Sequence, residues 1–271
     1  MTAAMAKRRV NIPIKKESDI RKMRSAGELA STILQDTART IVPGATTAEV
    51  DAYAADLIAR HGAISAFRGY RQFPGNICIS INEEVVHGIG SNRRIQPGDL
   101  VKIDIGIKLG GWIGDNAMTV PVGAIAPGHR KLLAATEQAL FEAIEHAREG
   151  VRLGDLCGSV ESYVTAHGFS VVRSLVGHGV GRKLHEKPEV PNYRPSGRSP
   201  VLKAGMVLAI EPMVNEGIGE VEWLDDGWTV VTGDRRASAH FEHTVLVTGG
   251  DPEILTWRPR TATAEQMGVR L

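Results

Sequence analysis

Two aspartates in neighbouring strand-like segments are the first side chains in this sequence whose types and spacing indicate chemistry. Residues 101–107 alternate with the period of a strand, which sets Asp104 on the face opposite to the isoleucines around it. A hairpin symmetric about residues 109 and 110 would place Asp104 directly opposite Asp115 on the returning segment, 112–120. Like charges paired across strands are destabilising, and a bound cation reverses that effect. If only this pair is considered, the alternative to a metal site is that both carboxylates are exposed on the hairpin and bind no metal.

Two glutamates later in the chain favour the cation. Glu211 ends the apolar run 206–210, which poorly suits an unpaired carboxylate, and Glu242 lies in the strand-like segment 241–247. Four carboxylates in one place cost many kcal/mol unless each is paired or binds a metal. Because two divalent cations balance four negative charges, the sequence predicts a site for two metal ions.

A glycine-rich segment, residues 177–188, adds two imidazoles. It contains His178 and His185, and its glycines let the backbone pack closely around His178. Its GxGxG spacing also occurs in phosphate-binding loops, but the lysine and hydroxyl residue of such loops do not follow. Beside four candidate metal carboxylates, the segment predicts a nitrogen ligand.

The elements that must position these side chains are amphipathic helices and short strands. Ser18 can cap the first helix. Thr46 and Glu49 have the spacing of a capping box at the start of the second helix, which His61-Gly62 closes. The predicted helices span residues 19–41, 46–61, 128–148 and 155–166, and the predicted strands span residues 77–81, 100–107, 112–120, 206–210 and 241–247.

Matched residues at nearly one offset indicate an internal repeat. His61-Gly62 recurs as His167-Gly168 after 106 residues, and a glycine lies six residues before both Asp104 and Glu211. Several matches at one offset suggest two similar halves that face each other across a pseudo-twofold axis.

The repeat predicts an α+β fold with antiparallel hairpins inside and helices outside. It matches Asp104 with Glu211 and Asp115 with Glu242, so each half offers two carboxylates. The predicted organisation is a flexible basic arm over residues 1–16 and a single domain over 17–271, with halves at about 17–122 and 123–250.

Composition and charge exclude several classes of protein. The 271 residues are 42% hydrophobic and 23% charged, which excludes collagen-like and disordered chains. The net charge of +1 argues against a polyanion binder, although residues 1–24 carry +6 and the remainder −5. Two cysteines give no disulfide framework and suit a reducing compartment. With no apolar run near the ~20 residues of a membrane span and no secretory signal pattern, we expect a cytoplasmic monomer without a membrane partner.

These side chains and the motifs around them resemble the pita-bread metallopeptidases, most closely the type I, bacterial methionine aminopeptidases. The resemblance runs from about Ile20 to Val247. Its carriers are Asp104, Asp115, His178, Glu211 and Glu242 in family order, residues 78–83 leading to His87-Gly88, residues 177–188, and Glu211-Pro212.

The resemblance implies a pita-bread fold and two divalent metal ions. Asp115 and Glu242 would bridge the ions, Asp104 would complete one of them, and His178 with Glu211 would complete the other. One imidazole and four carboxylates suit Mn²⁺, Fe²⁺, Co²⁺ or Zn²⁺, and the sequence leaves their identity open.

The resemblance also implies the reaction, which removes the N-terminal methionine from nascent chains when the next residue is small. Glu211 would shuttle a proton from the attacking water toward the leaving amine. His87 and His185 would contact the substrate and favour the tetrahedral intermediate. The methionine pocket would be lined by Tyr70, Phe73, Cys78, Leu184 and Trp228, with Phe67 nearby. Phe73 and Leu184 depart from the common bacterial tyrosine and phenylalanine but stay apolar.

Three alternative functions are open. Prolidases and aminopeptidase P, which cleave before proline, share the metal ligands but resemble longer chains with a sizeable N-terminal domain. Type II methionine aminopeptidases carry a long insertion after the second histidine, whereas only 25 residues separate His185 from Glu211 here. Non-catalytic pita-bread binding modules have lost ligands, and all five ligand positions are present in this chain.

The basic arm raises one question about partners. Residues 7–16 could touch ribosomal RNA near the exit of nascent chains, where the substrate emerges. A solvated flexible arm is the simpler interpretation, and we favour it.

Overall fold

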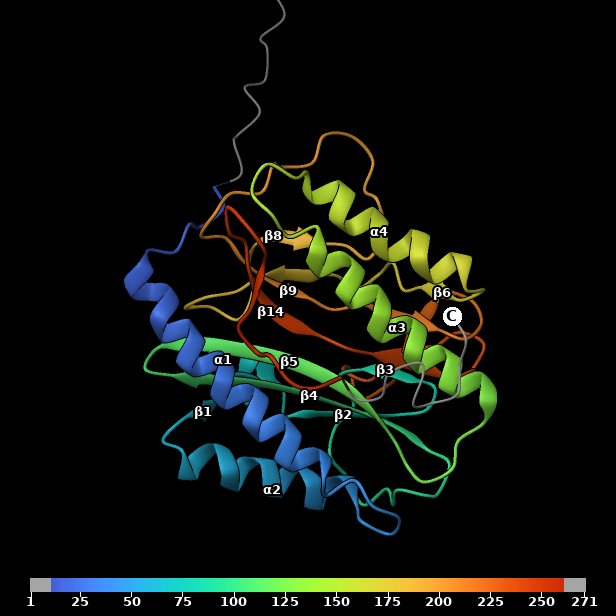
Figure 1. Cartoon of the computed structure of the whole chain (residues 1–271). Helices are drawn as coiled ribbons and strands as arrows, with labels where there is room; N and C mark the ends of the chain where they lie inside the picture. Colours follow the sequence, from blue (N-terminus) through green and yellow to red (C-terminus); the bar gives the residue numbers. More distant parts are fainter. Residues whose placement is uncertain (1–10, 261–271) are drawn as a thin grey trace, which may run out of the picture.

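Helices and antiparallel sheets form separate layers in this chain. The structure is a computed structural model that describes residues 11–260. In the view of Figure 1 the helices lie in front of the sheets, with α1 and α2 over one part and α3 and α4 over the other. The helices are α1 (Glu17–Ala38), α2 (Thr47–Arg60), α3 (Pro127–Glu145) and α4 (Leu153–Ala166). All four predicted helices are confirmed, with ends shifted by at most three residues.

The strands form four small antiparallel sheets within the described range. The first half of the chain supplies β1 (Ile64–Ser65), β2 (Cys78–Ile81), β3 (Glu84–Val86), β4 (Leu100–Leu109) and β5 (Trp112–Pro121). The second half supplies β6 (Ser170–Val171), β7 (Gly177–Gly179), β8 (Glu186–Val190), β9 (Val207–Ile210), β10 (Met213–Asn215), β11 (Val221–Trp223), β12 (Val230–Thr232), β13 (Ser238–His240), β14 (His243–Leu246) and β15 (Glu253–Ile254). The five predicted strands correspond to β2, β4, β5, β9 and β14.

The helix caps agree only in part with the sequence. The capping box of α2 is confirmed, since Thr46 N–H donates to Glu49 Oε2 (2.7 Å) and Glu49 N–H donates to Thr46 Oγ1 (3.2 Å). The cap predicted at Ser18 is wrong, because Ser18 lies inside α1. There the N-cap is Lys16, whose backbone N–H donates to Asp19 Oδ2 (3.2 Å). An acidic side chain in the first turn satisfies the helix end and suits its dipole.

The alternation of β4 divides its side chains between the core and a cavity. Ile103, Ile105 and Ile107 are fully buried in the apolar cluster that also contains residues of α1 and α3. Asp104, between them, points to the other face of the strand. The sequence pattern of 101–107 therefore has a simple cause: one face of β4 packs on helices and the other carries a polar group.

The pairing predicted for the β4–β5 hairpin is wrong by two residues. Asp104 pairs with Ala117, and Asp115 pairs with Gly106, rather than with each other. The turn lies at Gly110-Gly111, which both have positive φ (56° and 84°). A two-residue hairpin turn of this type needs positive φ at both positions, which glycine supplies at no steric cost and a leucine at 109 does not. A shift of two residues keeps both carboxylates on the same face.

Two pairings among residues 11–260 join strands of the two halves: β3 pairs with β12, and a single bridge links β5 to the residue before β14. Glu242 pairs with Ala117, and its N–H donates to the Ala117 carbonyl (2.9 Å). It thereby extends the order β4-β5 through β14 to β9 and β7. In that order, these strands or the residues directly next to them carry Asp104, Asp115, Glu242, Glu211 and His178.

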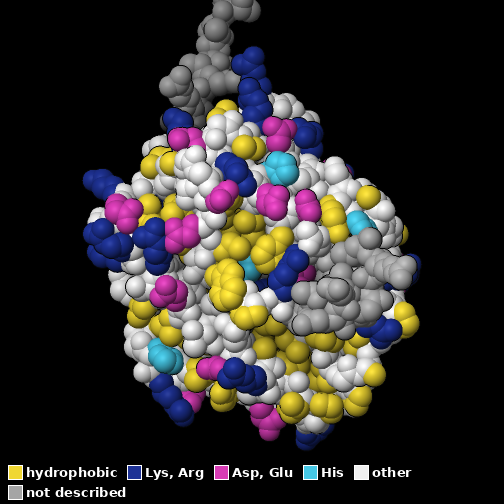
Figure 2. Space-filling view, viewed as in Figure 1, with side chains coloured by type: hydrophobic (Ala, Val, Ile, Leu, Met, Phe, Trp, Pro, Cys, Tyr) yellow, Lys and Arg dark blue, Asp and Glu magenta, His cyan; other side chains and the backbone are white. Residues whose placement is uncertain are grey.

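Charged side chains on the helical face are of mixed sign. In Figure 2, basic and acidic side chains alternate over this face and do not gather into one large patch of a single sign. The pattern agrees with the near-neutral net charge. Within the described range, no helix combines the length and the hydropathy that crossing a membrane requires.

The predicted basic arm lies mostly outside the described residues, which begin at 11. Its last part is anchored. The Lys15 N–H donates to the Gly205 carbonyl (2.7 Å), and its ammonium pairs with Glu186 while the residue is only 9% exposed.

Candidate metal centre

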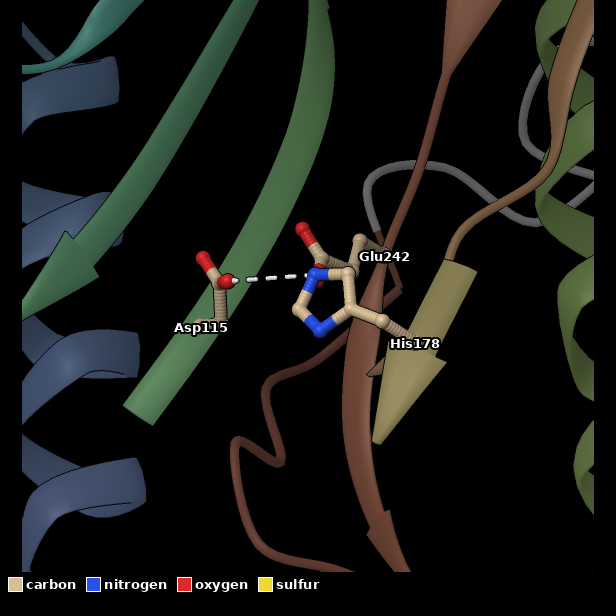
Figure 3. A group of neighbouring side chains, drawn as sticks. All are labelled: Asp115, His178 and Glu242. Carbon is tan, nitrogen blue, oxygen red and sulfur yellow. Dashed lines mark ion pairs between the residues drawn. The ribbon is translucent and has the colours of Figure 1, made fainter. Parts of the chain in front are cut away.

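The candidate ligands lie in or directly beside five strands. Asp104, Asp115 and His178 lie in β4, β5 and β7, whereas Glu211 directly follows β9 and Glu242 directly precedes β14. Figure 3 shows Asp115, His178 and Glu242 pointing toward one another from β5, from β7 and from the residue directly before β14. One ligand atom from each of the three lies within 4.8 Å of the others. The Nε2 of His178 lies 3.8 Å from Asp115 Oδ2 and 3.5 Å from Glu211 Oε1. Four side chains thus share one small volume, and the charge of Asp104 acts on Glu211 and Glu242 from β4.

Burial and mutual repulsion disfavour the ionised form of these carboxyl groups. It raises the pKa of Asp104, Glu211 and Glu242 well above the ordinary range, and neighbouring carboxylates raise the pKa of each further. Burial also raises the pKa of Asp115 to about 7. By itself the chain therefore favours protonated carboxyls here, and a bound cation would favour the ionised form.

Carboxylate oxygens that lack a hydrogen-bond partner provide a test of whether these residues could hold a metal ion. Asp104 Oδ1, Asp115 Oδ1 and Glu242 Oε1 are buried without a hydrogen-bond partner in residues 11–260. Buried polar atoms are nearly always paired, so three unpaired carboxylate oxygens in one place indicate a ligand that the chain does not supply. The buried His178, whose pKa is lowered to about 3 by burial, offers a neutral imidazole. The donor set fits divalent cations of the Mn²⁺ to Zn²⁺ series.

Two further histidines face the same volume. His185 Nδ1 lies 2.6 Å from the Tyr70 hydroxyl, and its ring packs edge-on against His178 with centroids 4.3 Å apart. His87 has a positive φ of 60°, a strained backbone conformation for a residue with a side chain. Burial lowers the pKa of His87 to about 4, so its imidazole is neutral at pH 7.

An apolar wall completes the site. Phe73 and Trp228 meet edge-to-face with centroids 5.1 Å apart. Cys78 pairs with Asp104 in the β2–β4 register, and burial raises the pKa of its thiol, so the thiol stays neutral beside the carboxylates. The structure brings every predicted site residue to one cavity of about 540 Å³, namely Phe67, Tyr70, Phe73, Cys78, His87, Asp104, Asp115, His178, Leu184, His185, Glu211, Trp228 and Glu242.

Sequence reasoning missed one histidine of this cavity. His240 lines it, is only 1% exposed, and has its Nε2 3.9 Å from Glu211 Oε2. Burial lowers its pKa to about 3. The sequence feature that could have predicted it is its position two residues before Glu242. That spacing places both side chains on one face of an extended segment.

A second polar cluster lies behind the ligands, on the α3 side. Arg258 is 3% exposed; its guanidinium donates to the carbonyls of Ala117 (2.8 Å) and Glu242 (3.3 Å). It also contacts the ring of His243, which packs against Phe141 of α3. Arg258 thus donates to both residues of the Ala117–Glu242 bridge, which links β5 to the start of β14.

Comparisons with known proteins agree with this geometry. A model of metallopeptidase family M24 matches residues 21–249. The chain is 48% identical over 245 residues to a methionine aminopeptidase of Clostridium perfringens (strain 13 / Type A), covering 90% of this chain and 98% of that protein.

Solved structures give the same result. The crystal structure of methionine aminopeptidase from Rickettsia prowazekii has a TM-score of 0.89 and 40% identity, covering 91% of this chain and all of that chain. The prolidase from Pyrococcus horikoshii OT3 has a TM-score of 0.74 and 25% identity, but the match covers only 64% of that chain. The fold is therefore shared with both groups, and the length only with the first.

Proposed function

The chain belongs to metallopeptidase family M24 and removes methionine from peptide amino termini, and we propose how its pocket carries out that hydrolysis. Its fold is the α+β pita-bread fold of this family. The observation that carries the assignment of roles is the convergence of four carboxyl groups, two of them buried and two partly buried, and a neutral imidazole beside an apolar wall.

The enzyme uses divalent metal ions, and we assign five side chains to hold two of them. Asp115 and Glu242 are central because their ligand atoms lie together with that of His178. Glu211 shares the His178 side, and Asp104 completes the other side. When bound, such ions polarise the substrate carbonyl and acidify a water molecule.

Glu211 moves the proton. Its carboxyl group lies inside the cavity, and its pKa is raised by burial and by Asp104 and Asp115. A carboxylate with a raised pKa accepts a proton from the attacking water and then transfers it to the leaving amine.

The two neutral histidines hold the substrate. The Tyr70 hydroxyl lies 2.6 Å from His185 Nδ1, and we assign the tautomer in which this O–H donates to Nδ1 and the ring proton of His185 is on Nε2. From there it donates to the carbonyl oxygen that becomes negative in the transition state. His87 contacts the peptide from the opposite wall, next to Trp228, whose ring centroid is 6.3 Å away.

The apolar wall binds the methionine side chain. Phe73, Trp228 and Leu184 give a thioether the aromatic and aliphatic contacts that it favours. Since the neighbouring part of the cavity carries the histidines and carboxyls, we propose that the residue after methionine must be small.

A metal add-back assay tests these assignments. Stripped protein, reloaded separately with Mn²⁺, Fe²⁺, Co²⁺ or Zn²⁺, is assayed with Met-Ala-x, Met-Leu-x and x-Pro peptides. We expect methionine release from Met-Ala-x, little from Met-Leu-x, and none from the stripped protein. Release from neither methionine peptide with any metal would contradict the proposal. Cleavage of x-Pro peptides would favour the prolidase-like alternative, to which the fold is also similar.

The place of action and the partners are proposals as well. Peptide amino termini are the substrate. We propose that the enzyme works as a monomer in the cytoplasm, because both of its cysteines, Cys78 and Cys157, are free and buried. Contact of residues 7–16 with the ribosome would be lost on their deletion, and unchanged co-sedimentation at low salt would contradict it.

A further inference from the structure

One histidine in the cavity has no task in the reaction proposed above. His240 ends β13, which pairs with β10 so that His240 stands opposite Met213, two residues after Glu211. The side chain lines the cavity and is 1% exposed. It therefore belongs to the reaction chamber and not to the outer surface.

The backbone of His240 is fixed, whereas its ring has no partner. The His240 N–H donates to Thr119 Oγ1 (2.9 Å), and the Thr119 hydroxyl donates to the His240 carbonyl (2.8 Å). Both ring nitrogens are buried without a hydrogen-bond partner in the described part of the chain. Since buried polar atoms are nearly always paired, these nitrogens indicate a contact that forms when the site is at work.

The nearest acceptor is the carboxyl group of Glu211, which lies between two imidazoles. Its Oε1 is 3.5 Å from His178 Nε2, and its Oε2 is 3.9 Å from His240 Nε2. The second distance is about 1 Å longer than a hydrogen bond, a gap that a small rotation of either side chain closes. The Glu211 carbonyl is already held by Asn192 Nδ2 (3.1 Å), so only the carboxyl group is free to turn.

We propose that His240 is a positioning residue for Glu211. Its ring N–H donates to Oε2, which directs Oε1 toward His178 and the metal side of the cavity. The inference rests on the proposed function, in which Glu211 both binds a metal ion and moves a proton. A carboxylate held at one oxygen can do both without rotating away from its ligand position.

Three variants separate hydrogen bonding from packing. His240→Leu keeps similar volume without a donor, His240→Gln keeps an N–H donor, and His167→Leu is the control on α4, where the His167 ring bonds only to the Tyr163 carbonyl and stacks on its ring. Mn²⁺ affinity is measured by calorimetry on stripped protein, and kcat and KM are measured with Met-Ala-x.

We expect His240→Leu to lose about 10- to 100-fold in Mn²⁺ affinity and in kcat, with KM nearly unchanged. His240→Gln should recover most of both losses, and the control should match the wild type. Wild-type Mn²⁺ affinity in His240→Leu, or equal loss in His240→Gln and His240→Leu, would overturn the proposal. If His240→Leu does not fold, His240→Met takes its place against His240→Gln.

The calorimetric readout separates the two hypotheses. A wild type that binds Mn²⁺ but releases no methionine would contradict the proposed function. The affinity difference between wild type and His240→Leu would still decide the role of His240.

Discussion

Two consecutive residues, Glu242 and His243, face opposite sides of the same extended segment and end in opposite situations. Glu242 faces the cavity, where its Oε1 is buried without a hydrogen-bond partner within residues 11–260. His243 faces α3, where Thr256 Oγ1 lies 3.0 Å from its Nδ1 and Arg258 contacts the ring. Both side chains are almost fully buried, at 2% and 1% exposure.

The difference between these two sides indicates where buried polar groups need a ligand from outside the chain. On the α3 side both terminal nitrogens of the buried Arg258 donate to backbone carbonyls beside a neutral histidine, and only its Nε has no partner in residues 11–260. On the cavity side, the carboxyl groups of Asp115, Glu211 and Asp104 act on Glu242 and raise its pKa, and they outweigh the one cation that acts on it, Arg258. A buried charge that the fold does not balance favours a ligand that does, which supports the proposal that the metal ions bind on the cavity side. We call the cavity side the open side and the α3 side the closed side.

The largest expected effect comes from the open side. Glu211→Gln cannot take up a proton, so we expect kcat for Met-Ala-x to fall by about 10²–10⁴-fold at saturating metal. Circular dichroism checks that the fold is kept, and Glu222→Gln, in an exposed ion pair with Arg235, is the matched control. Turnover near that of the wild type would overturn the role of Glu211.

Arg258→Met tests whether the closed side supports the open one. Loss of the guanidinium removes the donors to the Ala117 and Glu242 carbonyls, so the bridge that carries two ligand strands loosens. We expect Mn²⁺ affinity to fall by about 10- to 100-fold, as for other residues that orient metal ligands. Arg258→Lys, which keeps the charge, should lose less. Calorimetry that finds wild-type affinity in Arg258→Met would show that the two sides are independent.

The pH dependence of stability distinguishes metal-free from metal-loaded protein. In metal-free protein the folded carboxyls, Asp115 with a pKa of about 7 among them, hold protons that the unfolded chain has released. Their stabilisation is therefore lost as pH rises through the folded pKa values, by up to about 1.4 kcal/mol per pH unit for each group. Bound cations keep these groups ionised and remove the effect.

Lys102 of β4, whose pKa burial lowers to about 7, and the buried His240 and His243 are not assigned to hold a metal and titrate in both forms. The difference in Tm between the two forms therefore isolates the carboxyls. We expect that difference to grow from pH 5 to pH 8, and to grow less in Asp115→Asn. A difference independent of pH would contradict the carboxyl pKa shifts.

The smallest expected effect lies wholly on the closed side. The Thr256 hydroxyl oxygen accepts from the Thr244 N–H (3.0 Å) and lies 3.0 Å from His243 Nδ1. Thr256→Val removes this acceptor from the Thr244 N–H and leaves His243 Nδ1 only its contact with Arg258, so we expect a loss of about 1–3 kcal/mol in the free energy of unfolding. Chemical denaturation measures the loss, while kcat should stay at the wild-type value. A large fall in kcat would mean that Thr256 acts on the open side too.

Local sequence patterns predicted much of this arrangement. The alternation of residues 101–107 predicted the face of Asp104, and the Thr46–Glu49 capping box predicted the start of α2. The matching of carboxylates between the halves at an offset of about 106 residues stays a prediction. Each of these signals is carried by residues close in sequence or by a repeat. The roles assigned to the site residues remain predictions.

The features that were missed depend on contacts distant in sequence or on turn geometry. The hairpin register was decided by the backbone angles of Gly110 and Gly111. Arg258 reaches the Ala117 carbonyl across 141 residues of sequence, and no local pattern marks it. His240 shares a face with Glu242, but only the pairing of β10 with β13 brings it to Glu211.

The central claim is that the open side of the fold is completed by two divalent cations. Calorimetric titration of stripped protein with Mn²⁺ tests it most directly, with Asp115→Ala as the comparison. We predict two ions per wild-type chain and the loss of at least one in the variant, together with its methionine release. Absence of Mn²⁺ binding to the wild type, or equal stoichiometry in both proteins, would contradict the account.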